Sequence, residues 1–282
     1  MDAYLVPAVD GLAYGLLLFV VAAGLALAFG VAETLNLAHG TLYAVGAYAA
    51  AALGDGGWLR SVLALGAGTV AAAALGAAVA VAVHPVAHRG MLTQALLTFG
   101  IALVGGDLLV ARFGAQNLPV RAPFDDSSLT LLGHRYPAYR LAFLAVGVVL
   151  LAGLHLAVTR TRAGMLVRAL TDDRAMVAAL GVSPLAVRIG TLAVAGGLAG
   201  AAGVLGAPII GPRPGVADVV LLLSLIVVVL GGLRSLPRIA LAALAVGELQ
   251  TLGVALVPAV APFLLFAAMT VVLAARAKWR TA

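Results

Sequence analysis

The chain has 282 residues, of which 63% are hydrophobic and only 10% are charged, and its net charge at pH 7 is +6. A soluble globular domain has about 25% charged residues, and disordered chains are poor in hydrophobic residues. The composition therefore excludes both classes and predicts a polytopic α-helical membrane protein. The basic residues form no tract with interleaved aromatic residues, so no nucleic-acid partner is expected.

Apolar segments follow one another along the whole chain. A helix needs about 20 apolar residues to cross a bilayer, and the second segment is short enough to be a half-span or a re-entrant piece. We expect an all-α fold: a transmembrane helical bundle with eight or nine membrane segments, a broken or re-entrant region near residues 31–41, and a single domain over 1–282. The segments are 11–32, 41–53, 61–83, 91–111, 141–158, 186–210, 217–233, 239–257 and 259–275.

The distribution of Arg and Lys between the segments predicts the orientation. If the N-terminus is outside and all nine segments cross, eleven basic residues lie inside and six outside, which fits the positive-inside tendency. No Lys or Arg precedes the first apolar run, so this run is expected to be a retained span rather than a signal peptide. The N-terminus is therefore predicted outside and the C-terminus inside.

Polar residues interrupt the apolar pattern between residues 30 and 40. If this stretch is helical, Glu33, Asn36 and Gly40 share one face, and His39 lies beside Asn36. Such side chains are costly at membrane depth unless they face protein or water, so we interpret the stretch as a broken helix lining a substrate path. The alternative is a polar turn joining two helices. Glu248, inside segment 239–257, is either a further path residue or a structurally paired acid.

The internal loop over about 159–185 carries the signals of a short helix. Thr171, Asp172 or Asp173 can cap a helix from about Arg174 to Leu180, and Gly181 stands where such a helix stops. Its apolar residues, including Met176, share a face that fits a partner's groove or, alternatively, a lipid surface. Further along, the glycines from Gly196 to Gly203 indicate close helix packing or a subunit interface.

Several motifs are absent from the sequence. No P-loop pattern occurs and the only lysine is Lys278, so the chain has no means of holding ATP in the P-loop manner. Cysteine is missing and the histidines share no metal-ligand spacing, so neither a metal nor another cofactor is expected.

Three stretches resemble the permease family of branched-chain amino-acid ABC importers, in particular its LivH-type subunit. Residues 25–48 match the family pattern N-x-A-H-G followed by G-x-Y, at Asn36 to Gly40 and Gly46 to Tyr48. Residues 160–208 resemble its ATPase-coupling loop and the following helix. Residues 227–257 resemble its C-terminal region, although GGLRSLPRIA replaces the family's G-G-x-G-S-x-x-G-A.

The resemblance implies a permease in a bacterial inner membrane, with a second LivM-type permease, two cytoplasmic ATPases that bind the ATP, and an extracytoplasmic solute-binding protein as partners. The chain is then a non-enzymatic subunit that moves branched-chain or related amino acids. The alternatives are another small solute such as urea or short amides, a non-transporting structural partner, or an intramembrane enzyme using Glu33 and His39 as acid and base. The implied candidates for ATPase coupling are Arg168, Asp172, Asp173, Met176 and Gly181.

Overall fold

The computed structural model describes residues 2–54, 56–123, 127–131, 134–233 and 235–281. Within them it has eleven α-helices, one 3-10 helix and one short hairpin. The elements are α1 (Asp2–Gly30), α2 (His39–Leu53), α3 (Trp58–Val83), η1 (His84–Arg89), α4 (Met91–Phe113), β1 (Ser128–Leu131), β2 (His134–Pro137), α5 (Ala138–Arg160), α6 (Arg162–Asp172), α7 (Arg174–Ala179), α8 (Pro184–Ile210), α9 (Val216–Gly231), α10 (Leu236–Leu256) and α11 (Ala261–Thr281).

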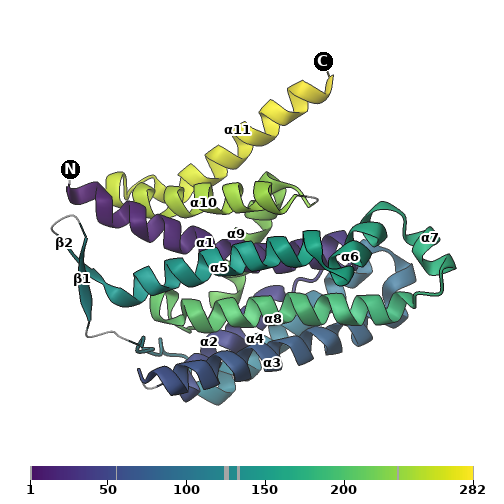
Figure 1. The fold of residues 1–282 in the computed structure, drawn as a ribbon, viewed down its shortest axis with the longest axis horizontal. Helices are drawn as coiled ribbons and strands as arrows, with labels where there is room; N and C mark the ends of the chain where they lie inside the picture. Colours follow the sequence, from purple (N-terminus) through teal and green to yellow (C-terminus); the bar gives the residue numbers. More distant parts are fainter. Residues whose placement is uncertain (1, 55, 124–126, 132–133, 234, 282) are drawn as a thin grey trace.

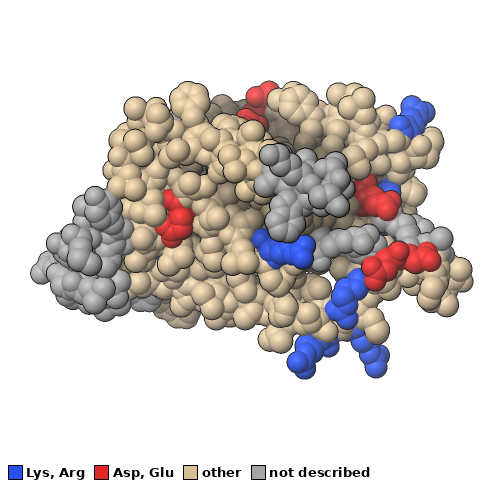
Figure 2. Space-filling view, turned by 90° about the horizontal axis from the view of Figure 1, so that it is seen from above, with Lys and Arg blue, Asp and Glu red and all other residues tan. Residues whose placement is uncertain are grey.

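The long helices run side by side, whereas α11 leans away from the bundle (Figure 1). The N-terminus and the hairpin lie at one end of the bundle, which we call the hairpin end. Helices α6 and α7 lie at the opposite end, which we call the loop end. On the face shown in Figure 2, Arg side chains gather toward the loop end, and most of the flank carries no charge.

Among the residues that the structure describes, six helices are long and apolar enough to cross a membrane, so the chain is a multi-pass membrane protein with the expected all-α fold. They are fewer than the eight or nine expected segments. Three expected segments are missing from this set. Segments 41–53 and 217–233 form helices of only 15 and 16 residues, or about 24 Å at most, and in segment 259–275 the apolar helix covers only Phe263–Val272 among the described residues. The six spans are Val6–Gly30, Trp58–Arg89, Met91–Phe113, Ala138–Arg160, Leu185–Ile210 and Leu236–Leu256.

Helix α8 packs against α3, α2 and α1 through its glycines. A Cβ atom on Gly203 would lie 2.0 Å from the carbonyl oxygen of Tyr43 in α2, and one on Gly196 would lie 2.4 Å from that of Ala72 in α3. Only glycine allows two helix backbones to come this close. In lipid, helices gain no hydrophobic free energy by associating, so close van der Waals packing of this kind holds them together. The packing interpretation of this glycine run is therefore confirmed within the chain.

The connection between α4 and α5 contains the antiparallel hairpin, in which Ser128 pairs with Pro137. The buried hydroxyl of Tyr136 donates a hydrogen bond to Oδ1 of Asp10 in α1 at 2.5 Å, and Arg140 forms an ion pair with the other oxygen of the same carboxylate. Burial and the bond to Asp10 raise the pKa of Tyr136, which keeps its hydroxyl protonated. These contacts join the hairpin, α1 and α5 at one end of the bundle.

Candidate functional site

The polar stretch between α1 and α2 is a break in the helical path. Helix α1 ends at Gly30, residues 31–38 are not helical, and α2 begins at His39. The side-chain oxygen of Asn36 accepts a hydrogen bond from the backbone N–H of Ala38 at 3.1 Å. This bond satisfies an N–H that would otherwise bond to a backbone carbonyl in a helix. Glu33 has a φ of 48°, in the left-handed region that side chains rarely adopt. The expected break near residues 31–41 is therefore present.

The break is held inside the protein by specific polar contacts. His39 is fully buried, and its Nε2 donates to the carbonyl oxygen of Val21 in α1 at 3.0 Å. The hydroxyl of Thr98 in α4 donates to the Leu35 carbonyl at 2.9 Å and accepts from the Leu37 N–H at 3.1 Å. Non-helical backbone is tolerated at membrane depth only where protein or water satisfies its polar groups, and Thr98 does this for the Leu35 carbonyl and the Leu37 N–H.

The sequence-predicted path residues do not all lie together. Asn36, His39 and Gly40 are buried at the start of α2, whereas Glu33 is exposed. The expected face shared by Glu33, Asn36 and Gly40 is wrong, because the stretch that would carry it is not helical. Glu248 lies in α10 against α1, where a Cβ atom on Gly11 would be 2.6 Å from its Oε2.

The depth of the break follows from its neighbours on α1. His39 contacts α1 at Val21, and Leu17 of α1 and Tyr43 of α2 both lie beside Gly206 of α8. Helix α2 therefore starts alongside the middle of α1 and runs back toward the hairpin end. Glu248 meets α1 ten residues before Val21, which corresponds to about 15 Å along the helix axis.

Helix α9 is the second short helix, and it starts where α2 starts. A Cβ atom on Gly40 would lie 2.1 Å from the carbonyl oxygen of Ala217, and the Leu233 carbonyl beyond the end of α9 lies near Gly30. The two helices therefore begin at one level inside the bundle and run in opposite directions. Each helix N-terminus presents unsatisfied N–H groups and a partial positive charge.

A pocket of about 180 Å³ opens between the start of α9, the middle of α2 at Ala44 and Tyr48, and α4. Sequence reasoning did not select the polar residues that line it, because they come from four separate segments. The available signals were the two acids inside expected membrane segments, Asp107 in 91–111 and Asp218 in 217–233, because acids are unusual there. These residues are Tyr48 of α2, Asp107 of α4, Arg213 of the α8–α9 connection and Asp218 of α9.

The loop over 159–185 forms α6 and α7 at the loop end (Figure 1). Asp173 caps α7, accepting a hydrogen bond from the Met176 N–H at 2.9 Å, and Gly181 follows the helix with a φ of 86°. The predicted short helix is therefore present, one residue shorter than expected. The side chains of Arg168 and Asp172 are exposed, and Arg168 donates to the carbonyl of Val158 in α5.

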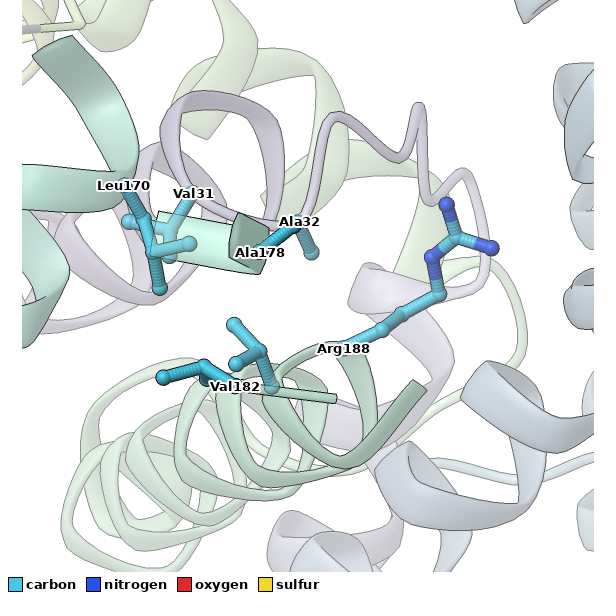
Figure 3. Close-up of a pocket in the computed structure, with 7 residues that line it drawn as sticks. Val31, Ala32, Leu170, Ala178, Val182 and Arg188 are labelled. Carbon is cyan, nitrogen blue, oxygen red and sulfur yellow. The ribbon is translucent and has the colours of Figure 1, made fainter. Parts of the chain in front are cut away.

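Helix α7 and the residue after it, Leu180, have one buried anchor and two large exposed apolar side chains. Val177 packs with Leu170 of α6 and Val31 after α1, whereas Met176 is 62% exposed and Leu180 is 74% exposed. Figure 3 shows a small pocket beside this anchor, where Leu170 and Val31 lie close together. The same view shows the Arg188 guanidinium pointing away from Val182. The loop is thus fastened to the bundle while part of its apolar surface stays open.

Comparison with known proteins agrees with this architecture. The family model described as "Branched-chain amino acid transport system / permease component" matches residues 8–274. The chain is also similar to the "High-affinity branched-chain amino acid transport system permease protein BraD" of Pseudomonas aeruginosa. The two are 26% identical over 266 residues, which cover 89% of this chain and 86% of BraD. No solved structure matches the chain.

The family match spans nearly the whole chain and includes the break, the loop and both short helices. It removes the alternative of an intramembrane enzyme using Glu33 and His39. The chain belongs to the family of permease components of branched-chain amino acid transport systems, and it is a multi-pass transport protein rather than an enzyme.

Proposed function

We propose that this chain is a translocating subunit of an ATP-driven importer and moves branched-chain or related amino acids across a bacterial inner membrane. The observation that carries the proposal is the α6–α7 loop, which leaves Met176 and Leu180 exposed at the Arg-rich end of a chain matched by the permease family. An apolar helix face of this kind fits a groove on a partner protein. ATP is bound by separate ATPase subunits, and this chain binds no cofactor.

In this proposal, movement of the two ATPases reaches the membrane helices through α7. Val177 is the mechanical link, because it packs against Leu170 and against Val31, the first residue after α1. A displacement of α7 therefore acts directly on the broken segment that precedes His39. A second, LivM-type permease completes the membrane unit, and an extracytoplasmic solute-binding protein delivers the solute.

The orientation proposed is N-terminus outside and C-terminus inside, so that the loop end faces the cytoplasm. Two features support it: the basic residues that gather at the loop end and the helix α7 that is available there for an ATPase. The same path through Asn36, His39 and Gly40, with Glu248 nearer the hairpin end, serves as the candidate solute route.

Charge reversal in the loop tests the coupling. Asp172→Arg combined with Asp173→Arg is expected to abolish co-purification of the ATPases and leucine uptake, while the chain still inserts. Asp173→Asn keeps a capping side chain without the charge, and this separates loss of charge from loss of α7. Arg121→Asp, an exposed charge reversal near the hairpin end, is the matched control.

Uptake is measured in bacteria that lack their own branched-chain permeases and express this chain with its partner subunits. Unchanged ATPase co-purification in the double variant contradicts the coupling role. Uptake of urea or a short amide, with no uptake of leucine, isoleucine or valine by the wild type, contradicts the proposed solute class.

A further inference from the structure

The pocket between the start of α9 and the middle of α2 lies at a depth where charge is unusual. The midpoint of α4 (Met91–Phe113) is residue 102, so Asp107 lies five residues beyond it, or about 8 Å along the axis. This is within the roughly 15 Å half-thickness of the hydrocarbon core. The Asp107 side chain is nevertheless exposed on this chain. Carboxylates at that depth face a water-filled cavity or protein rather than lipid, so this face of α4 borders a polar space.

The charged side chains that line the pocket do not form ion pairs with one another. Asp107 and Asp218 provide two carboxylates and Arg213 one guanidinium, and all three are exposed. Within the part of the chain that the structure describes, none of them forms a salt bridge. Asp218 also stands in the first turn of α9, where it offsets the positive end of that helix. This role explains the presence of Asp218 in the pocket but not that of Asp107 or Arg213.

Tyr48 supplies an independent observation at the same place. Its side chain is only 2% exposed and lines the pocket, and its ring packs on Phe113 with a centroid separation of 5.0 Å. Among the described residues its hydroxyl has no hydrogen-bond partner. Buried hydroxyls are normally paired, so an unpaired one at the wall of a pocket indicates a group that a ligand satisfies.

We propose that this pocket is a binding station for the zwitterionic backbone of an α-amino acid, an inference that rests on the proposed transport function. Asp107 and Asp218 bind the ammonium group, and Arg213 binds the carboxylate together with the free N–H groups at the start of α9. The Tyr48 hydroxyl completes the polar contacts. The aliphatic side chain of the solute lies against the apolar wall formed by Leu103, Leu109 and Val216.

The arrangement separates amino acids from the alternative cargo. Urea and short amides carry no charge, so they form no charge-assisted hydrogen bonds in which both partners are ionised with Asp107, Asp218 or Arg213. A zwitterion complements both signs and reaches the apolar wall at the same time. The pocket thus selects for charge at one end of the solute and for an aliphatic group at the other.

The test measures equilibrium binding of radiolabelled leucine to the assembled permease–ATPase complex in lipid nanodiscs, without the solute-binding protein. Competitors are leucinamide, which lacks the carboxylate, and 4-methylpentanoate, which lacks the ammonium group. Asp107→Asn and Asp218→Asn are each expected to weaken leucine and leucinamide binding at least about tenfold and to leave 4-methylpentanoate unchanged. Arg213→Gln is expected to weaken leucine and 4-methylpentanoate and to leave leucinamide unchanged.

Controls separate recognition from folding. Asp107→Glu keeps the charge and is expected to restore binding to within a few-fold of the wild type, and Arg121→Gln, outside the pocket, is expected to bind like the wild type. Unchanged leucine binding in both Asp variants overturns the proposal, and so does loss of partner co-purification, because the acids then pair with a neighbouring subunit instead. Absence of leucine binding to a wild-type complex that does transport leucine also overturns it. If the wild type transports no branched-chain amino acid in cells, the proposed function itself fails.

Discussion

The close contact between α8 and α2 at Gly203 offers a direct test of the helix packing. On α8, a Cβ atom at Gly203 would lie 2.0 Å from the carbonyl oxygen of Tyr43, whereas real Cβ contacts stay above 3.0 Å. Gly203→Ala therefore forces α2 and α8 apart by at least 1.0 Å. Gly190 lies on the same helix with nothing within 4 Å of its Cβ position, so Gly190→Ala is the matched control.

The two substitutions are chemically identical and are expected to change stability in opposite directions. Overpacking at Gly203 costs about 1–3 kcal/mol, whereas alanine at an open helical position contributes about 0.5–1 kcal/mol. The difference of about 1.5–4 kcal/mol corresponds to roughly 3–16 °C between the two thermal midpoints, at about 2–4 °C per kcal/mol. The midpoints are measured on the purified chain in detergent, by fluorescence-detected size exclusion after heating.

The displacement also has a functional consequence, because α2 carries His39 and Tyr48. Gly203→Ala is expected to lower leucine uptake, and Gly190→Ala to leave it unchanged. Equal thermal midpoints for the two variants would refute the reasoning, because the α2–α8 contact would then not require glycine.

Three further predictions concern other parts of the chain. Tyr136→Phe removes the bond to Asp10 and is expected to destabilise the chain by about 1–3 kcal/mol near pH 7. Because the folded-state pKa of Tyr136 is raised, this stabilisation is complete below the unfolded value of about 10 and is lost as the pH rises above it, so the difference in thermal midpoint between wild type and variant shrinks at alkaline pH. Glu248→Ala is expected to lower uptake while assembly persists; normal uptake in an assembled complex removes Glu248 from the solute route. The chain has no cysteine, so single cysteines report orientation directly. A membrane-impermeant maleimide is expected to label Gln116→Cys in intact spheroplasts and His88→Cys only after permeabilisation, and the reverse pattern inverts the proposed topology.

Features with local causes could be predicted from the sequence. Asp173 caps α7 and Gly181 follows it with a positive φ, as expected, because capping and left-handed turns depend on residues within one helical turn. The break before His39 was also predictable, since polar residues at membrane depth disrupt an apolar helix. What the pattern alone did not reveal is that Glu33 points outward while Asn36 and His39 are buried.

The pocket could not be predicted in the same way. Tyr48, Asp107, Arg213 and Asp218 are separated by up to 170 residues, and nothing local to any of them indicates that they line one cavity. Their meeting depends on where α2, α4 and α9 pack. That packing in turn depends on individual glycines such as Gly40, whose Cβ position is blocked by the Ala217 carbonyl.

The sequence by itself determined that this protein is a helical membrane protein. It also determined the break between α1 and α2 and the capped helix in the loop. Each of these follows from composition or from interactions between residues close in the chain. Only the tertiary structure decided that α2 and α9 start at one level and which polar groups border the space beside them. The physical reason is that helices in lipid associate through close backbone contacts, and the position of such a contact depends on both partners.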